Sequence, residues 1–426
     1  MDVELTRRVK PLSVQHADIS VPPSKAHTLR ALLLASVARG TSVITNPLMG
    51  EDQKNLIACL KNLGVPVSVS NNSITVTGTG GTFTPICEEL NCGESGVAMN
   101  FLSALCPFSL KPVVLTGKEG LLKRPVGEIV SGLLRLGADI SYEDTENYPP
   151  LRIKPSPLRG GKTEMKGAFT SQYFSSLTIA SALAGEDVEI NCTDEMSEKP
   201  YYDITLEMME KFGVKVSNQE YKRMLIESGQ YYTSCTIAVE GDYSSASYFF
   251  EAAAVCGITV HLSNMNENSV QGDKKIIEYM KDMGCTIQKN GSVLAVRGGK
   301  LKPLIADCNG TPDLVPTLAV CAAFAEGKSL LKNVAHLKFK ECDRITAVCT
   351  ELAKMGIHAE LEGSDLAVYG SREKIHAAAI HSHNDHRIAM SFAVPGLLLS
   401  GQTIAHPECV SKSFPDFWEV LNTFTT

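Results

Sequence analysis

The stretch that decides the fold begins GTSVITN at residues 40–46, and a similar strand-like run after a turn recurs five more times. The further copies read KPVVLTG (111–117), GEDVEIN (185–191), GITVHLSN (257–264), GKSLLKN (327–333) and GQTIAHP (401–407). Their starts lie about 70 to 75 residues apart, the regular period that marks a repeat architecture. The sequence therefore predicts six copies of one structural unit.

Five of the units also contain a helical pattern that ends in an apolar residue followed by glycine. These pairs are Leu63-Gly64, Leu136-Gly137, Phe212-Gly213, Met283-Gly284 and Met355-Gly356. Glycine just past the last helical turn adopts the left-handed conformation that closes a helix. Apolar strand residues follow each pair, so each unit is expected to mix strands with helices.

A second set of helices is apolar almost all the way round. Its members read TLRALLLASVA (28–38), SGVAMNFLSALC (95–106), SQYFSSLTIASALA (171–184), SSASYFFEAAAVC (244–256), DLVPTLAVCAAFA (313–325) and HRIAMSFAVPGLLL (386–399). A helix without a polar face is buried, so we expect strands and amphipathic helices to surround three central helices in each domain. Pro316 and Pro395 are expected to kink two of these helices or to lie in a first turn.

Composition narrows the class of protein. At 426 residues the chain is too long for one ordinary core, which favours two domains. A net charge of −7 argues against nucleic acid as the main partner. No apolar run is long enough for a signal peptide or a membrane span, so we expect a cytoplasmic protein that does not bind membranes. The 13 cysteines include no CxxC pair and are interpreted as core filler in a reducing compartment.

The entry to each apolar helix is polar and rich in turn residues. The six entries are PPSKAHT (22–28), NCGESG (91–96), GAFTSQ (167–172), EGDYSS (240–245), NGTPD (309–313) and HSHNDH (381–386). Helix N-termini carry partial positive charge and free N–H groups, so they bind anions. Several entries carry a cation within or directly after them, such as Lys25, His386 and Arg387. The pattern favours a site for a multiply anionic ligand over six ordinary helix caps.

At these entries the chain resembles the 5-enolpyruvylshikimate-3-phosphate synthase family, and the resemblance covers essentially the whole sequence. The matching stretches are PPSKAHTLRALLLA, KRPVGE, GAFTSQY, EKPYYDITLEMMEKFGV, EGDYSSASYFFEAAA, TPDLVPTLAVCAAFAEG, KECDRI, HNDHRIAM and KSFPDFWEVL. The resemblance implies an α/β protein with two domains, each an inverse α/β barrel. Each barrel would be a threefold repeat of β-α-β-α-β-β units with buried central helices.

The same resemblance implies where the domains begin and end. One domain would comprise residues 1–21 and 241–426 and the other residues 22–240, with the active site in the cleft between them. The second half of the chain would then pair with the first twenty or so residues. The implied substrates are phosphoenolpyruvate and shikimate 3-phosphate, and we expect a monomer that needs no cofactor. The scattered His and Cys residues show no metal-ligand spacing, so we expect no metal either.

The implied ligands of phosphoenolpyruvate are all present. By resemblance, Lys25, Arg124, Gln172 and Lys412 bind its phosphate, while Arg344 and Arg387 bind its carboxylate. The chemistry agrees, because a trianionic substrate needs several fixed cations and the planar fork of arginine fits carboxylate and phosphate.

Two carboxylates are implied to be catalytic. Enolpyruvyl transfer must protonate a methylene carbon and remove a proton from the acceptor hydroxyl, which requires an acid and a base. By resemblance, Glu341 handles the methylene proton and Asp313 lies against the acceptor hydroxyl. Lys25 and Lys340 are expected to assist proton transfer. The alternative is a surface helix charge for Glu341 and a helix cap for Asp313.

The acceptor side departs from the family pattern. The implied acceptor ligands that are present are Arg30, Thr170, Ser171, Gln172, Tyr201, Asp313 and Lys340. Ala26 and Glu198 replace serines, His336 replaces an asparagine, and Asn100 stands where an arginine is usual. Glu198 would repel an acceptor phosphate unless it points away and Ser197 takes its place.

These departures keep other functions open. The main alternative is a paralogue that transfers enolpyruvyl to another hydroxyl, one without a phosphate near Glu198. A transferase for a UDP-amino sugar is less favoured, because the loop KEGLLKRP (118–125) lacks its cysteine. A lyase acting on shikimate 3-phosphate and a non-catalytic scaffold both fail to explain the complete set of phosphoenolpyruvate ligands. An RNA-processing or RNA-binding protein would need a basic face and a nucleophilic histidine, whereas this chain is acidic and its histidines follow no such motif.

Overall fold

The computed structural model describes residues 5–290 and 293–425, and their contacts divide the chain into two compact units. One unit comprises Met1–Pro23 with Glu240–Thr426, and the other comprises Ser24–Val239. The limits expected from the sequence differ by two residues at the first crossover and by one at the second. Each unit has its own core of buried apolar side chains.

Three four-stranded sheets form the outside of the unit Ser24–Val239, and all have the same design. In spatial order they are β14 (Thr236–Ala238), β3 (Arg39–Thr45), β5 (Ser73–Thr79) and β4 (Val67–Val69); β6 (Glu89–Asn91), β7 (Val113–Thr116), β9 (Leu151–Lys154) and β8 (Asp139–Tyr142); β10 (Gly161–Met165), β11 (Val188–Cys192), β13 (Arg223–Ile226) and β12 (Ser217–Gln219). In each sheet the first pair of strands is parallel and the next two pairs are antiparallel. The repeat seen in the sequence thus corresponds to a repeated pattern of strand pairing.

The other unit follows the same plan. Its sheets are β2 (His16–Ser20), β15 (Thr259–Ser263), β17 (Val293–Arg297) and β16 (Thr286–Asn290); β18 (Ile305–Asp307), β19 (Gly327–Lys332), β21 (Asp365–Gly370) and β20 (His358–Glu362); and β1 (Thr6–Arg8), β23 (Thr403–Ala405) and β22 (Ala379–His381). Strand β2 pairs in parallel with β15, and β1 pairs with β23. The expected pairing of the second half with the N-terminal residues is therefore confirmed.

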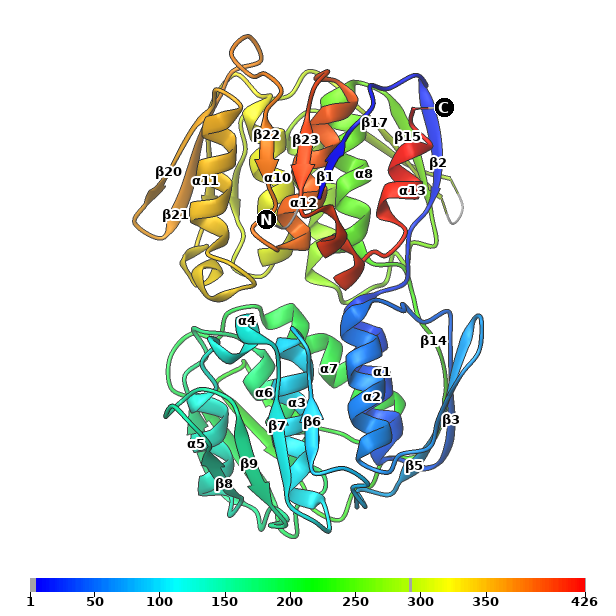
Figure 1. Ribbon diagram of the computed structural model, residues 1–426, viewed down its shortest axis with the longest axis vertical. Coiled ribbons are helices and arrows are strands. Elements are labelled where there is room, and N and C mark those ends of the chain that lie inside the picture. The colour runs from blue at the N-terminus through cyan, green and yellow to red at the C-terminus, as the bar shows by residue number, and fades with distance from the viewer. Residues whose placement is uncertain (1–4, 291–292, 426) are drawn as a thin grey trace. The chain divides into compact units, whose positions relative to one another are not determined.

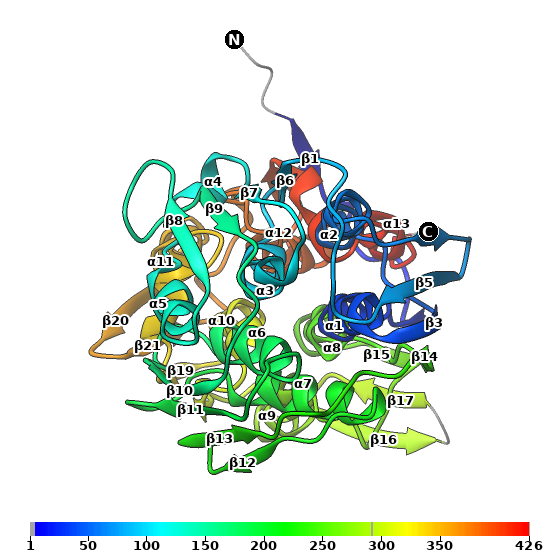
Figure 2. The same cartoon turned by 90° about the horizontal axis from the view of Figure 1, so that it is seen from below.

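The apolar helices lie inside these sheets, as expected. Figure 2 shows α1 (Lys25–Val37), α3 (Gly96–Leu105) and α6 (Gln172–Ser181) surrounded by strands. In Figure 1 the corresponding helices of the other unit are α8 (Tyr243–Cys256), α10 (Val315–Ala323) and α12 (His386–Ala393). The expected inverse α/β barrel, with helices inside and strands outside, is confirmed.

Amphipathic helices complete each repeat. They are α2 (Glu51–Asn62), α5 (Gly127–Arg135), α7 (Lys199–Lys211), α9 (Ile276–Asp282), α11 (Arg344–Lys354) and α13 (Phe417–Asn422), with the single turn α4 (Glu119–Leu122) before Arg124. Gly64, Gly137, Gly213, Gly284 and Gly356 all have φ between 84° and 102°, the left-handed conformation expected after a helix end. No helix among the described residues is long and apolar enough to cross a membrane.

Two expectations were wrong. Pro316 does lie in the first turn of α10, but Pro395 lies in neither a kink nor a first turn of α12. It lies in the 3-10 turn η5 (Val394–Leu397) that follows α12, because a proline inside the helix would remove a backbone hydrogen bond. Cys87 is exposed, so it is not core filler like the seven buried cysteines.

Candidate active site

In the unit Ser24–Val239, Lys25 is the first residue of α1. The helix begins there because the Ser24 side chain accepts a hydrogen bond from the backbone N–H of His27. The Nζ atom of Lys25 lies 2.7 Å from the Oδ2 atom of Asp52, a buried carboxylate on α2. The sequence analysis missed Asp52, which fixes the ammonium group at the N-terminus of α1.

Gln172 opens α6 and is held by one of the unusual residues. The side-chain amide of Asn100 on α3 donates to the Oε1 atom of Gln172 over 2.9 Å. The backbone N–H of Gln172 donates to the hydroxyl of Thr170 over 3.2 Å. Asn100 stands where the family pattern has an arginine. It therefore orients Gln172, which is expected to bind the phosphate of phosphoenolpyruvate.

Glu198 does not point away from the expected acceptor residues. It is 2% exposed, and its Oε2 atom accepts a hydrogen bond from the hydroxyl of Thr170 over 2.8 Å. Its backbone carbonyl accepts from the hydroxyl of Ser171 over 3.0 Å. Its φ of 57° is left-handed, which a non-glycine residue rarely adopts. Ser197 instead donates to the carbonyls of Gly167 and Ala168.

Arg30 joins α1 to α7 rather than presenting a free guanidinium. It is 3% exposed, and it donates to the hydroxyl of Thr205 over 2.7 Å and to the carbonyl of Tyr201 over 2.8 Å. Burial lowers the pKa of Arg30 to about 10, while the nearby Tyr201 raises it. Arg30 therefore fixes the start of α7, where Tyr201 lies.

Arg124 follows the short helix α4 and lies close to the start of α3. A Cβ atom added to Gly96 would come within 3.0 Å of its Nη1 atom, so a larger residue there would displace the guanidinium. The next residue, Pro125, accepts a 2.6 Å hydrogen bond from the hydroxyl of Tyr173 on α6. The backbone directly after Arg124 is thus hydrogen-bonded to α6, the helix that begins at Gln172.

In the other unit, Arg344 is the first residue of α11 and contacts three carboxylates. Its Nη1 atom lies 2.7 Å from Asp313, its Nη2 atom 2.9 Å from Glu341, and its Nε atom 2.7 Å from Asp385. Its side chain is only 2% exposed. Asp385 also caps α12, because its Oδ1 atom accepts from the backbone N–H of Arg387 over 2.8 Å. The structure therefore brings both expected catalytic carboxylates to one guanidinium.

Two further cations complete this cluster. The Nη2 atom of Arg387 lies 3.0 Å from Asp313, and its Nη1 atom donates to the hydroxyl of Tyr248 on α8 over 3.1 Å. The Nζ atom of Lys412, in the 3-10 turn η6 (Pro407–Lys412), lies 2.9 Å from Glu341. Asp313 and Glu341 are thus each bound by two cations.

The charges in this cluster shift one another's titration. Burial raises the pKa of Asp313, but Arg387, Arg344 and Lys340 outweigh it and hold that pKa well below the ordinary value. Burial lowers the pKa of Arg344, whereas Asp385, Glu341 and Asp313 raise it far above the ordinary value. Asp313 is therefore ionised at neutral pH, and it does not cap a helix.

The sequence analysis missed Asp385 and Tyr248. Asp385 lies in HNDHRIAM directly before two expected cationic positions, which is the signal that an acidic partner is present. Nothing in the sequence marked Tyr248 as a site residue, because a tyrosine in an apolar helix is expected to pack in the core. Lys340 is half-buried, and its electrostatic effect on Asp313 places it with the same cluster. Among the departures, Ala26 packs on the core and His336 is buried.

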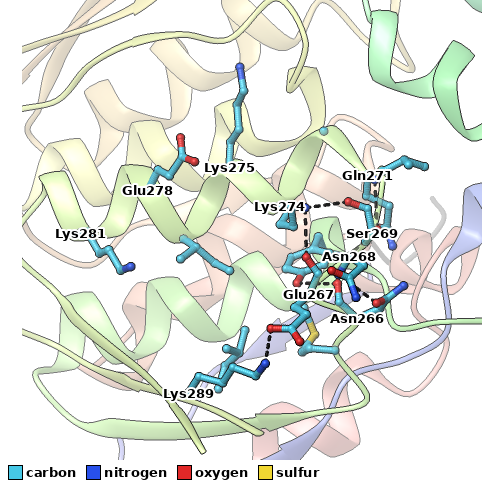
Figure 3. Close-up of a pocket in the computed structure, with 16 residues that line it drawn as sticks. Asn266, Glu267, Asn268, Ser269, Gln271, Lys274, Lys275, Glu278, Lys281 and Lys289 are labelled. Carbon is cyan, nitrogen blue, oxygen red and sulfur yellow. Dashed lines mark hydrogen bonds and ion pairs between the residues drawn. The ribbon is translucent and has the colours of Figure 1, made fainter. Parts of the chain in front are cut away.

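A pocket elsewhere contains none of the expected site residues. It has a volume of about 780 Å³ and lies in the unit that holds α8 and α9, where Figure 3 shows Lys275, Lys281 and Lys289 among its lining. Lys289 forms an ion pair with Glu267. Within the described residues, no group of three or more His, Cys, Asp or Glu side chains is arranged to hold a metal ion.

Comparisons with known proteins identify the relatives of this chain. Residues 9–421 match the family model described as EPSP synthase (3-phosphoshikimate 1-carboxyvinyltransferase). The 3-phosphoshikimate 1-carboxyvinyltransferase of Methanoculleus marisnigri is 39% identical over 97% of this chain and 98% of its own length. That of a Sulfurovum species is 38% identical over 98% and 99%. The structure of EPSP synthase from Acinetobacter baumannii has a TM-score of 0.82 at 28% identity, covering 98% of this chain and 97% of that one.

Proposed function

The chain belongs to the EPSP synthase family and is a 3-phosphoshikimate 1-carboxyvinyltransferase, and we propose which of its residues carry the reaction. The enzyme transfers the enolpyruvyl group of phosphoenolpyruvate to the 5-hydroxyl of shikimate 3-phosphate and releases phosphate. Relatives of this name that match the chain over nearly its whole length do not favour a paralogue with another acceptor. The residue roles below are therefore argued for this reaction.

The observation that carries the proposal is the pairing of cations with the two expected catalytic carboxylates. Arg344, Arg387 and Lys412 all contact Asp313 or Glu341 at 2.7 to 3.0 Å. Phosphoenolpyruvate would offer these cations a carboxylate and a phosphate as further partners. Arginine binds such groups through two parallel hydrogen bonds, so the exchange replaces one charged contact by another.

This exchange prepares both carboxylates for proton transfer. When a cation moves from a carboxylate to the substrate, that carboxylate becomes easier to protonate. Glu341 would first take a proton from solvent and then deliver it to the methylene carbon, while the acceptor oxygen bonds to the adjacent carbon and Asp313 takes the hydroxyl proton. In the second step the carbon–oxygen bond to phosphate breaks and the methyl group returns a proton to Glu341.

The expected site residues of the unit Ser24–Val239 are proposed to bind the same two substrates. Lys25, Arg124 and Gln172 would bind the donor phosphate, and Lys25 would assist proton transfer. The residues proposed to bind the acceptor are Thr170, Ser171, Gln172, Tyr201, Asp313 and Lys340. Arg30 would bind the acceptor as well and also fix Tyr201, because its hydrogen bonds to Thr205, Ala26 and Tyr201 use three of its five N–H donors.

We propose further that the enzyme is a cytoplasmic monomer that uses no cofactor and binds neither nucleic acid nor membranes. The net charge of −7 supports the expectation about nucleic acid. Light scattering after gel filtration measures the mass in solution and so tests the monomeric state. A mass near twice 46.0 kDa would show a dimer and contradict the proposal.

The experiment that tests the residue roles is a phosphate-release assay in deuterated water. Release is expected only when phosphoenolpyruvate and shikimate 3-phosphate are both present, with deuterium entering the methylene group of the product. Glu341→Gln keeps the side-chain volume and should abolish the deuterium uptake. Equal release with phosphoenolpyruvate alone, or normal deuterium uptake in Glu341→Gln, would contradict the assignment.

A further inference from the structure

His27 is a buried histidine that the proposed reaction does not use. It is the third residue of α1 and is 3% exposed. Its Nδ1 atom lies 2.9 Å from the hydroxyl oxygen of Ser24, and its Nε2 atom lies 3.5 Å from the Oε2 atom of Glu207 on α7. A buried polar ring is costly to folding unless its nitrogen atoms have partners. His27 therefore links the residue before α1 to a second helix.

The partners of the two ring nitrogens decide where the proton lies. His27, followed by Lys211, lowers the pKa of Glu207 to about 2, although burial raises it. Glu207 is therefore a carboxylate at neutral pH, and a carboxylate only accepts hydrogen bonds. The Nε2 atom of His27 accordingly carries a proton. In the neutral ring the Nδ1 atom then accepts a hydrogen bond from the hydroxyl of Ser24, whose oxygen keeps its lone pairs for the helix.

Ser24 is the cap of α1 and the first residue of the unit Ser24–Val239. Its side-chain oxygen accepts a hydrogen bond from the backbone N–H of His27 over 3.4 Å, which is long for such a bond. A serine side chain has three staggered rotamers, so a long cap bond on its own holds the hydroxyl loosely. The imidazole of His27 selects the rotamer that faces the helix.

Lys25 is the first residue of α1, so the helix cap sets the backbone from which its side chain starts. Two contacts from α2 also hold this residue. Its Nζ atom lies 2.7 Å from Asp52, and its backbone carbonyl accepts a hydrogen bond from the side-chain amide of Gln53 over 3.3 Å. The contact of the imidazole with α7 adds a second attachment. The first turn of α1 is thus held by both α2 and α7.

We propose that His27 is a positioning residue for Lys25, because its imidazole fixes the cap of the helix that presents the Lys25 ammonium group. The proposal rests on the role of Lys25 in binding phosphoenolpyruvate proposed above. A first turn that frays in the free enzyme has to become ordered when the substrate binds, and this ordering weakens binding. A serine cap stabilises a helix N-terminus by about a factor of five. Loss of the contact between the imidazole and Ser24 should therefore weaken binding of phosphoenolpyruvate by about that factor.

Two amide side chains separate the two contacts of the ring. In His27→Asn the amide oxygen takes the place of Nδ1 and accepts from Ser24, whereas in His27→Gln the amide nitrogen takes the place of Nε2 and reaches only Glu207. We expect the KM for phosphoenolpyruvate, at saturating shikimate 3-phosphate, to rise about fivefold in His27→Gln and to stay near the wild-type value in His27→Asn. The change in kcat should be smaller than the change in KM. A KM in His27→Asn that equals or exceeds that of His27→Gln would overturn the proposal.

The variant Lys25→Met tests whether the effect passes through Lys25. In the double variant Lys25→Met with His27→Gln, the KM for phosphoenolpyruvate should equal that of Lys25→Met alone, because the group that His27 positions is gone. A further rise of about fivefold in the double variant would overturn the link from His27 to Lys25. An unchanged KM in Lys25→Met alone would instead refute the role of Lys25 in the reaction.

A measurement without substrate separates the positioning by His27 from the role of Lys25. Hydrogen exchange at the backbone amides of residues 27–29 reports the opening of the first turn of α1. It should be about fivefold faster in His27→Gln than in His27→Asn, and equal rates would overturn the proposal whatever Lys25 does. Thermal melting identifies any variant that does not fold. Glu207→Ala then takes its place, because that side chain is 30% exposed, and exchange no faster than in the wild type would contradict the attachment to α7.

Discussion

Glu198 is the residue whose replacement we expect to improve binding of the acceptor. Its buried carboxylate accepts the hydroxyl of Thr170 over 2.8 Å, and Thr170 is one of the hydroxyls proposed to bind shikimate 3-phosphate. The acceptor phosphate must therefore take this hydrogen bond from a carboxylate of like charge. The variant Glu198→Gln keeps the side-chain length, the acceptor oxygen and the left-handed backbone, and it removes only the charge.

The magnitude follows from the two kinds of hydrogen bond. A hydrogen bond to a charged group contributes about 1.5–3 kcal/mol, and one between neutral groups about 0.5–1.5 kcal/mol. The glutamine therefore competes less strongly for Thr170, by about 1–1.5 kcal/mol. At 1.4 kcal/mol for each factor of ten, the dissociation constant for shikimate 3-phosphate should fall about five- to tenfold.

The assay is calorimetric titration of shikimate 3-phosphate, with shikimate as the ligand that lacks the phosphate. The affinity for shikimate should change little, because the competing carboxylate meets no phosphate there. The double variant Thr170→Val with Glu198→Gln is the matched control, and the gain should disappear in it. Weaker binding of shikimate 3-phosphate by Glu198→Gln would show that Glu198 binds the acceptor and would refute the argument.

Three further outcomes follow from the buried charges. Glu341→Gln should lower kcat by about 10²–10⁴-fold with little change in the KM for phosphoenolpyruvate, since a positioned acid contributes that much; near-normal turnover would remove Glu341 from the mechanism. Arg344→Met should lower the free energy of unfolding by about 3–5 kcal/mol in urea titrations, because Asp385 would be left buried without its cation; an unchanged midpoint would contradict this. Glu251→Met should raise that free energy by about 1–3 kcal/mol, because neither carboxylate oxygen of this buried residue has a hydrogen-bond partner among the described residues. Burial raises the pKa of Glu251 in the folded protein, so wild-type stability falls as pH rises above the unfolded value; the gain should therefore grow from pH 5 to pH 8, and a constant gain would disprove the titration.

The sequence by itself determined the architecture. The sequence contains six strand-like runs at one spacing, six helices without a polar face and glycines after the outer helices. Together these features predict a repeat architecture in which the central helices are buried. These signals are local, because the spacing of apolar residues along a helix or strand decides which face is buried. The N-terminal entries of the central helices also located Lys25, Gln172, Asp313 and Arg387, since a helix N-terminus needs polar caps wherever it lies.

Only the tertiary structure decided what those residues contact. Asn100 and Gln172 are 72 residues apart in the chain, and Thr170 and Glu198 are 28 apart, yet each pair is joined by one hydrogen bond. The sequence analysis treated Asn100 and Glu198 as departures without partners. It also gave no reason to connect Asp385 with Arg344. A hydrogen bond depends on tenths of an ångström and on the packing of helices from different repeats, which the periodicity of one segment does not specify.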